Sequence, residues 1–333
     1  MLNKKPKVSV CIPNYNNGQF IGEAIQSVLN QSYGDFELII VDNCSTDNSV
    51  TEINRFSDPR IKIYKNDKNI GFLKNWNKCI SLVNGEYISL LHSDDKYEPD
   101  MIKREVEIFD SNPNVGLVFS PVKQIDSKGD CIGYSKSPFN STRVIKGDDF
   151  FKELIMEDHV PTPSVMVRKE CYDILGSFDE YVGPPCDWEM WLRVSLYYDV
   201  AFISEPLAHY RIHSGCGSFE VCSDLSWNIS QYNLLEKTFS TIPIDKKDLL
   251  LLKPKSMRSF AKRIVRSSTR YLDNKNPKML RQNIAFAFAI DESIVLYPGT
   301  WAMLFLSCIS ASLAANIVLL LRKLKKRYPK NPK

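Results

Sequence analysis

Two short stretches near the start of the chain decide its fold: residues 8–16 read VSVCIPNYN, and residues 37–47 read ELIIVDNCSTD. Each contains a short, largely apolar run, residues 8–12 in the first and 38–41 in the second, as expected of a strand that is buried on both faces of a sheet. Each run then ends in a polar cluster. Between the two runs, apolar residues recur at the spacing of one helix face: Ile21, Ala24, Ile25, Val28 and Leu29.

The same alternation of strand and helix continues to about residue 120. Further strands are expected at 61–64, 87–91 and 115–120, and a further helix at 72–82. This order implies a mostly parallel sheet with helices on both faces, in which ligands bind at the carboxyl ends of the strands. Polar clusters follow three of the strands directly, at residues 14–17, 42–47 and 92–95. We therefore expect these clusters to lie along one edge of the sheet.

The second half of the sequence is less regular. Residues 164–167 predict a strand deep in the sheet, residues 126–130 predict a turn between two strands, and residues 188–197 predict a helix. From about Ser226 onward the pattern predicts helices. Residues 253–270 form a basic amphipathic stretch.

The cluster that follows the strand at 87–91 reads His92-Ser93-Asp94-Asp95. Adjacent carboxylates are hard oxygen ligands that suit Mg²⁺ or Mn²⁺, and a diphosphate can complete the coordination shell. Two aspartates in a loop are more often a solvated turn or a helix cap. The metal interpretation gains weight from the two other polar clusters that we expect at the same edge.

Six segments, taken in order, resemble the signature of family 2 glycosyltransferases. They are residues 8–16, 37–47, Asn69-Ile70-Gly71, His92–Asp95, Cys186–Arg193 and Tyr210–Ser214. The resemblance covers roughly residues 6 to 220. It implies the α/β GT-A nucleotide-diphospho-sugar transferase fold, a Rossmann-like mixed sheet flanked by helices, here with a helical C-terminal extension.

The resemblance also implies a division of the chain. Residues 1–222 would form the catalytic domain, with a nucleotide-binding half at 1–120 and an acceptor half at 121–222. Residues 223–333 would form the helical extension, with an apolar helix at 301–321 and a basic tail at 322–333.

Site residues are carried over by position. Asp187 would be the general base that faces the acceptor hydroxyl. The nucleotide sugar would be bound by Pro13, Tyr15, Asp42, Asp47, Ser93, Asp94 and Arg211. A divalent metal, Mn²⁺ or Mg²⁺, would be held by Asp94, Asp95 and His213. Simpler roles stay open: Tyr15 as ordinary packing, Asp42, Asp47 and Asp187 as helix caps, and Arg211 and His213 as surface residues.

His92 departs from the family pattern, which commonly has aspartate there. A neutral imidazole cannot supply the same charge, so metal affinity would depend more on Asp94, Asp95 and the phosphates of the donor. The Gln-x-x-Arg-Trp segment of processive members does not occur in the sequence, which favours single transfers.

The expected function is thus inverting transfer of a sugar, most simply from a UDP-sugar, to an acceptor hydroxyl of a surface polysaccharide or a lipid-linked oligosaccharide. One alternative is a sugar nucleotidyltransferase, which would need a Gly-rich, Arg-containing loop after the first strand, where this chain has Pro13–Gly18. The other is a catalytically weak protein that binds nucleotide sugars, an idea that His92 alone favours.

Charge and hydropathy point to a membrane. Residues 322–333 carry seven basic residues and no acid, whereas the rest of the chain has 36 basic and 39 acidic residues. Residues 301–321 hold no charge and, as a helix, would be about as long as a bilayer core is thick. Because nucleotide sugars are cytosolic, we expect a peripheral or monotopic helix on the cytoplasmic face of the cell membrane, and no binding of nucleic acid. A single-pass or a cytoplasmic protein is the alternative.

The cysteines give no sign of a disulfide framework or a thiolate metal site. There are nine of them, an odd number, and no Cys-x-x-Cys pair occurs. Reduced thiols in the cytosol fit this pattern best.

Overall fold

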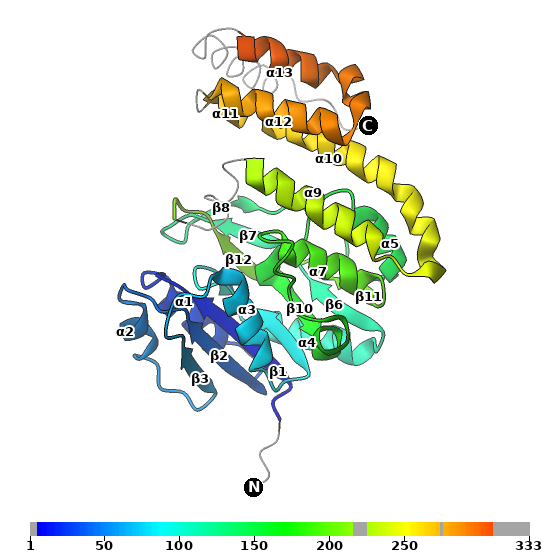
Figure 1. Ribbon diagram of the computed structural model, residues 1–333. Coiled ribbons are helices and arrows are strands. Elements are labelled where there is room, and N and C mark those ends of the chain that lie inside the picture. Colours follow the sequence, from blue (N-terminus) through cyan, green and yellow to red (C-terminus); the bar gives the residue numbers. More distant parts are fainter. Residues whose placement is uncertain (1–4, 216–224, 274–275, 309–333) are drawn as a thin grey trace. The chain divides into compact units, whose positions relative to one another are not determined.

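The computed structural model describes residues 5–215, 225–273 and 276–308. The chain forms two compact units, residues 1–221 and residues 222–333. The first unit is an α/β structure and the second is helical (Figure 1).

The first unit is built on an eight-stranded mixed sheet with the order β3-β2-β1-β4-β10-β6-β11-β9. Its strands are β1 (Val8–Asn14), β2 (Phe36–Asp42), β3 (Ile61–Lys65), β4 (Tyr87–Leu90), β6 (Val115–Phe119), β9 (Arg143–Ile145), β10 (Val165–Arg168) and β11 (Asp199–Phe202). The first four strands are parallel to one another, while β10 runs antiparallel to both β4 and β6. This is the mixed sheet that the sequence predicts, including a strand near 165 deep inside it.

The order of the strands reverses at β1, because β2 and β3 lie on one side of it and β4 on the other. In open α/β sheets a crevice forms at such a switch point, beyond the carboxyl ends of the strands. Here β4 pairs with β1 only as far as Cys11, whereas β2 stays paired as far as Asn14. From this pairing a crevice is expected beside Pro13. The strand also runs one residue past the predicted stop at Pro13. Because β4 no longer pairs with β1 at this position, the N–H that proline lacks costs no hydrogen bond between these two strands.

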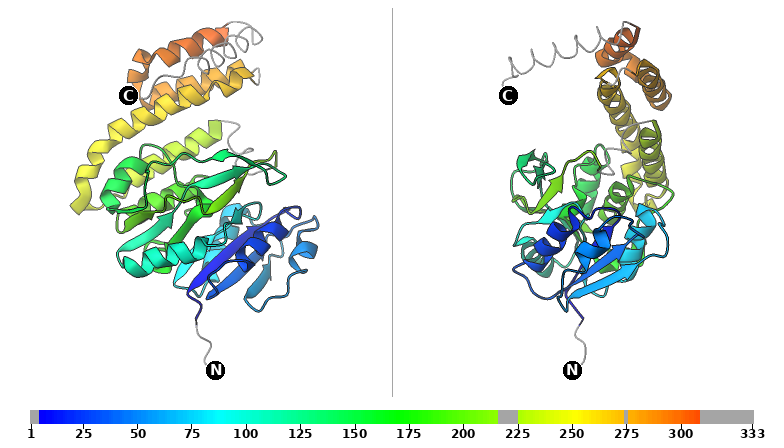
Figure 2. Two further views of the ribbon diagram at one scale, coloured as in Figure 1. Left: turned by 180° about the vertical axis from the view of Figure 1, so that it is seen from behind. Right: turned by 90° about the vertical axis from the view of Figure 1, so that its left-hand side faces the viewer.

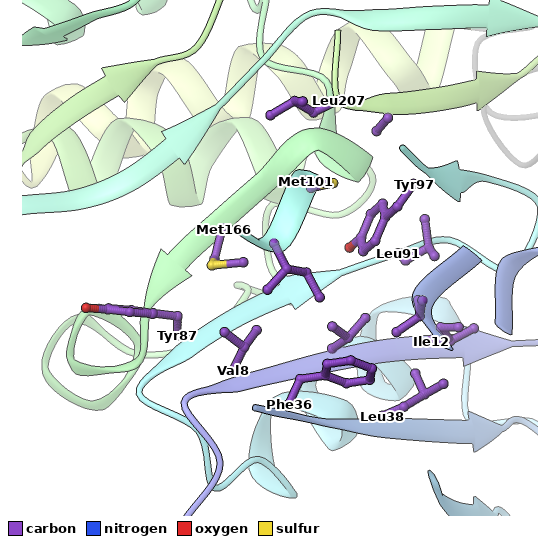
Figure 3. Close-up of a cluster of buried hydrophobic side chains, with 14 of the residues drawn as sticks. Val8, Ile12, Phe36, Leu38, Tyr87, Leu91, Tyr97, Met101, Met166 and Leu207 are labelled. Atoms are coloured by element: carbon purple, nitrogen blue, oxygen red, sulfur yellow. The ribbon is translucent and has the colours of Figure 1, made fainter. Parts of the chain in front are cut away.

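Helices cover both faces of this sheet (Figure 2). Alternate residues of β1 face α1 (Ile21–Leu29) and α4 (Met101–Ser111), and together they form the main core. Figure 3 shows part of this core, with side chains of β1, β2, β4 and β10 gathered around Tyr97 and Met101. The opposite face of β1 and β2 contacts α3 (Phe72–Ser81). Burial on both faces explains the continuous apolar runs of these strands.

A smaller sheet has the order β5-β12-β7-β8. Its strands are β5 (Lys96–Tyr97), β12 (Ala208–Arg211), β7 (Val122–Ile125) and β8 (Cys131–Tyr134). The predicted turn at 126–130 joins β7 to β8. By pairing β12 with β5, this sheet brings Arg211 close to the segment that follows β4.

The remaining elements of the first unit are short. They are α2 (Ser49–Ile53), α5 (Gly147–Leu154), the 3₁₀ turn η1 (Thr162–Ser164), α6 (Lys169–Leu175) and α7 (Cys186–Ser195). Six cysteines of the described residues, Cys11, Cys44, Cys79, Cys131, Cys171 and Cys186, are free thiols.

The second unit consists of α9 (Leu225–Ser240), η2 (Ile244–Leu252), α10 (Lys253–Ser267), α11 (Arg270–Asp273), α12 (Pro277–Ile290), η3 (Glu292–Leu296) and α13 (Pro298–Cys308). Helix α12 packs against both α10 and α13 (Figure 2). The predicted apolar helix at 301–321 overlaps α13 as far as Cys308; the rest of it and the basic tail at 322–333 lie outside the described residues. Within the described part of the chain, no helix combines the length and the apolar character needed to cross a bilayer.

Candidate active site

Three loops at the carboxyl edge of the sheet meet around the crevice beside β1. They follow β1, β2 and β4, and they are the three polar clusters of the sequence. Polar side chains join the first loop to the second. The N–H of Asn16 donates to Ser45 Oγ (2.9 Å), and the N–H of Thr46 donates to Asn16 Oδ1 (2.8 Å). Asn16 adopts the left-handed conformation, with φ 51°, which asparagine tolerates better than most residues.

Asp42 is buried at the end of β2. One of its oxygens accepts hydrogen bonds from Asn14 Nδ2 (2.9 Å) and Ser45 Oγ (2.5 Å), and the other accepts from the N–H of Ser45 (3.1 Å). These bonds fix the floor of the crevice. Tyr15, which follows in the first loop, is 45% exposed and has room to meet a ligand.

Asp47 serves the backbone of the two loops. Its carboxylate accepts from the N–H of Gly18 (2.8 Å) and from the N–H of Ser49 (2.9 Å), which begins α2. Burial opposes the charged form, but these hydrogen bonds outweigh it and lower the pKa of Asp47. A side chain at Gly18 would collide with Asn48. The helix-cap alternative thus describes the contacts that Asp47 makes.

Ser93 links the first loop to the third. It is buried, and its hydroxyl accepts a hydrogen bond from Asn17 Nδ2 at 2.8 Å. The segment that holds the acidic cluster is therefore tied to the loop that carries Tyr15.

His92, Asp94 and Asp95 form a cluster in which one ligand atom of each lies within 4.8 Å of the others. Asp95 Oδ1 accepts from the N–H of Arg211 (2.8 Å), while Asp95 Oδ2 lies 3.4 Å from His92 Nδ1. Two buried atoms of the cluster, His92 Nε2 and Asp95 Oδ2, make no hydrogen bond to any described residue. Buried polar atoms of this kind are costly unless something binds them. Two carboxylates beside an imidazole fit a divalent cation such as Mn²⁺.

Burial and the neighbouring charges shift the pKa values of His92 and Asp95. Burial favours the neutral imidazole of His92, but the carboxylates of Asp95, Asp94 and Asp187 outweigh it and raise the pKa of His92. Burial raises the pKa of the Asp95 carboxyl, although His92 opposes the shift. The start of α7 lies near this cluster, because Asp187 bonds to Thr162 of η1, and η1 contacts β4 and β5 on either side of residues 92–95.

Arg211 lies against the same segment but points into the protein. Its side chain has no exposed surface. Nε donates to the carbonyl of Asp94 (2.7 Å), Nη1 to the carbonyl of Asp126 (3.2 Å), and Nη2 to Glu23 Oε2 (3.0 Å). The guanidinium carbon lies 4.6 Å from the ring centre of Phe20. Arg211 therefore stabilises the acidic segment from the buried side, through the carbonyl of Asp94.

His213 faces the acidic cluster from the strand β12 side. Its Nε2 lies 3.1 Å from Asp94 Oδ2, and its ring packs against Phe20 with the ring centres 4.8 Å apart. The side chain is 8% exposed. The structure thus brings His213 together with Asp94, as the resemblance implies for a shared metal.

Asp187 lies in the first turn of α7. Its Oδ2 accepts from the hydroxyl of Thr162 (2.5 Å), and its Oδ1 accepts from the N–H of Trp188 (2.8 Å). Thr162 belongs to η1, next to β4, so two elements converge on this carboxylate. Each oxygen keeps capacity for a further hydrogen bond.

Several residues that contact the site residues were not predicted from the sequence. The indole of Trp76 stacks on the imidazole of His92, with ring centres 4.9 Å apart and 29° between the planes. Thr162, Phe20 and Glu23 support Asp187, His213 and Arg211. They lie far along the chain from the residues that they contact, and no short motif marks them.

The chain matches the family described as Glycosyl transferase family 2 over residues 9–172. An uncharacterised glycosyltransferase of Methanocaldococcus jannaschii is 32% identical over 213 residues, 62% of this chain and 71% of that protein. A second, from Nostoc sp., is 29% identical over 235 residues, 66% of this chain and 69% of that one.

Two solved structures share the fold. TarS residues 1–349 of S. aureus, in complex with UDP, superimposes with a TM-score of 0.59 at 15% identity, covering 87% of this chain and 91% of that one. The mannosyltransferase PcManGT of Pyrobaculum calidifontis, in complex with GDP-Man and Mn²⁺, gives a TM-score of 0.54 at 18% identity, covering 98% and 84%.

The fold and the clustered polar edge thus define a GT-A-type transferase. The chain belongs to glycosyl transferase family 2.

Proposed function

We propose that this glycosyltransferase moves a sugar from a UDP-sugar to an acceptor hydroxyl with inversion, in single transfers. The observation that carries the proposal is that Asp187, at the start of α7, bonds to Thr162 of η1, which contacts the strands on either side of the acidic cluster. A carboxylate for the acceptor and a cation-binding group for the leaving diphosphate then stand at one crevice. That is the pair of groups that inverting transfer requires.

In this proposal residues 1–120 bind the nucleotide. Tyr15 stacks on the base, because it is exposed beside the crevice, and Pro13 shapes the pocket where β4 has left β1. Asp42 accepts a hydrogen bond from the base. Asp47 and Ser93 contribute by holding the three loops together through their hydrogen bonds.

Asp187 acts as the general base within the acceptor half, residues 121–222. Its carboxylate takes the proton of the acceptor hydroxyl as that oxygen bonds to the anomeric carbon, and the bond from this carbon to the diphosphate breaks. Thr162 orients the carboxylate. Asp94, Asp95 and His213 would hold Mn²⁺ or Mg²⁺, which when bound supplies charge neutralisation for the leaving group.

The choice of UDP draws on TarS, whose structures contain UDP and UDP-GlcNAc. PcManGT contains GDP-Man instead, so GDP-mannose is the second donor to test. For the acceptor we propose a surface polysaccharide or a lipid-linked oligosaccharide. Such an acceptor fits a helical extension, residues 223–333, that holds the protein on the cytoplasmic face of the cell membrane.

The experiment is a panel of nucleotide sugars, assayed for release of nucleoside diphosphate with and without EDTA. We expect release from one donor, dependent on Mn²⁺ or Mg²⁺. Asp187→Asn should lower sugar transfer by at least a hundredfold while UDP still binds, since the variant lacks only the base. Full transfer by this variant would exclude Asp187 as the base. Release of pyrophosphate would instead identify a nucleotidyltransferase.

A further inference from the structure

Helix α13 of the second unit is apolar on every side. Its residues 298–308 read PGTWAMLFLSC and include no charge. One side is used inside the unit: Leu306 is buried with Leu280 and Ile284, and Met303 packs against them. A helix that is apolar all round belongs in a core or against a bilayer. Trp301 and Phe305, on the other side of α13, are not part of that cluster among the described residues.

Large exposed apolar side chains lie at the end of η3 and on α13, which follows it: Leu296 of η3 and Trp301 and Phe305 of α13, together called the apolar row. They are 83%, 58% and 65% exposed. Trp301 and Phe305 are four residues apart, so they lie on the same helix face. The indole Nε1 of Trp301 donates to the carbonyl of Val295 (2.7 Å), which fixes the indole beside η3, where Leu296 lies.

Helix α10, which contacts η3 and α13, is strongly basic. It carries six basic residues and no acidic residue between Lys253 and Ser267. Two of the six form ion pairs: Lys253 with Glu236, and Arg258 with Asp291. Lys262 Nζ lies 5.9 Å from the ring centre of Tyr297, the residue that joins η3 to α13. Residues 225–273 and 276–308 together hold twelve basic and six acidic residues, a net charge of +6.

We infer that the apolar row, with the basic residues of α10, binds the surface of an anionic lipid bilayer. Exposed Trp, Phe and Leu beside Lys and Arg are the composition of interfacial membrane helices. Basic residues near an anionic leaflet strengthen such binding. A purely apolar protein partner would account for the row but not for the excess of positive charge. The inference builds on the proposed membrane attachment and assigns it to named residues.

The test uses the full chain and flotation with two kinds of vesicle: phosphatidylcholine alone, and phosphatidylcholine with 30 mol% phosphatidylglycerol. We expect binding to the anionic vesicles that weakens as salt is added. Trp301→Ser with Phe305→Ser should lower this binding at least tenfold. Leu296→Ser with Phe305→Ser, which keeps the Trp301 hydrogen bond, should do the same. The matched control is Ile244→Ser with Leu251→Ser, which removes two exposed apolar side chains outside the row and should bind as the wild type does.

Unchanged binding by folded variants of the row would overturn the inference, and would assign any attachment to residues beyond 308. It would also be overturned if the variants separated a dimer into monomers without affecting vesicle binding, since a second copy would then cover the row. Donor turnover is measured on the same samples without vesicles. If the wild type turned over no donor, the proposed sugar transfer would be refuted, but the proposed binding of the apolar row to membranes would not. The failure of one proposal can therefore be told apart from the failure of the other.

Discussion

The guanidinium of Arg211 lies wholly inside the first unit, and its hydrogen bonds go to the protein itself. It reaches the carbonyls of Asp94 and Asp126 and the carboxylate of Glu23. The planar guanidinium has five N–H donors and can bond to these three acceptors in different directions, which the single ammonium group of lysine cannot do. We therefore expect Arg211 to position the metal-binding segment rather than to touch the phosphates of the donor.

Arg211→Lys tests this role. The metal concentration that gives half-maximal activity should rise by about 10- to 100-fold, the usual cost of losing a group that orients metal ligands. Binding of UDP without metal should stay unchanged. Lys96→Gln is the control, since Lys96 also approaches Glu23 Oε2, at 3.4 Å, but is not part of the fork. Weakened metal-free UDP binding in Arg211→Lys would instead indicate a phosphate contact.

Glu105 of α4 makes the stability of the first unit dependent on pH. It is fully buried, neither carboxylate oxygen has a hydrogen-bond partner, and burial raises its pKa well above the usual value. The folded state thus binds a proton that the unfolded state releases above about pH 4.5. Folding stability is highest below that pH and falls as the pH rises toward the folded-state pKa.

Glu105→Met should accordingly raise the free energy of unfolding at pH 8, by about 1–3 kcal/mol, because it removes buried polar atoms without partners. The gain should shrink as the pH falls toward 4.5. Urea unfolding at several pH values measures both effects. Equal gains at pH 5 and pH 8 would show that the charge of Glu105 is not their cause.

Residue roles were predictable from the sequence to different depths. The meeting of Asp94 and His213 follows from motif order and was expected. Thr162 bonds to Asp187 from 25 residues away, and Trp76 stacks on His92 from 16 residues away. Such contacts depend on tertiary packing, which no local sequence pattern encodes. The charge of Arg211 indicated a ligand contact, whereas its burial, which decides its role, is a tertiary property.

At the scale of elements, a clamp joins α3 to the segment that leads into α7. The side chain of Asn77 donates to the carbonyl of Phe178 (2.8 Å) and accepts from its N–H (3.0 Å). The Phe178 ring contacts Trp76, with ring centres 5.4 Å apart, and Trp191 of α7, at 6.1 Å. Helix α7 carries Asp187, so the clamp helps to set where the proposed base lies.

Asn77→Ala should therefore lower transfer about tenfold and destabilise the fold by about 1–3 kcal/mol, because the peptide groups of Phe178 lose their partners. Nucleotide affinity should hold, as the three loops are untouched. Lys74→Ala, on the same helix, removes only an exposed pair with Glu180 at 3.8 Å and should have little effect. Steady-state kinetics with thermal unfolding decide between these outcomes.

The predicted strands and helices that correspond to β1, α1, β2, β3, α3, β4 and β6 agree with the structure to within about two residues, because burial on both faces gives β1 and β2 largely apolar sequences, whereas α2 and α4 were given no bounds. The small sheet was less visible. β5 has two residues, and the edge strand β9 has exposed or half-exposed residues. Neither is long enough to show a period. Their pairing is set by distant strands, which a local pattern cannot report.

At the scale of the whole molecule, each unit has a hydrophobic cluster of its own. Leu280→Ala, at a fully buried position of α12, should cost about 2–5 kcal/mol in the second unit. It should leave UDP binding intact, since the nucleotide contacts lie in the first unit. Circular dichroism during heating and calorimetric titration with UDP measure the two properties. Loss of UDP binding in a folded variant would contradict this division.

The place where β4 parts from β1 has a consequence for how such proteins diversify. The crevice expected there follows from main-chain pairing, because β4 stops pairing with β1 at Cys11, three residues before β2 stops pairing with β1 at Asn14. Substitutions in the surrounding loops can then alter what it accepts without remaking it. TarS, which was solved with UDP, and PcManGT, which was solved with GDP-Man, share this fold at 15–18% identity with the present chain. A fold can thus stay the same while most of the sequence that builds it changes.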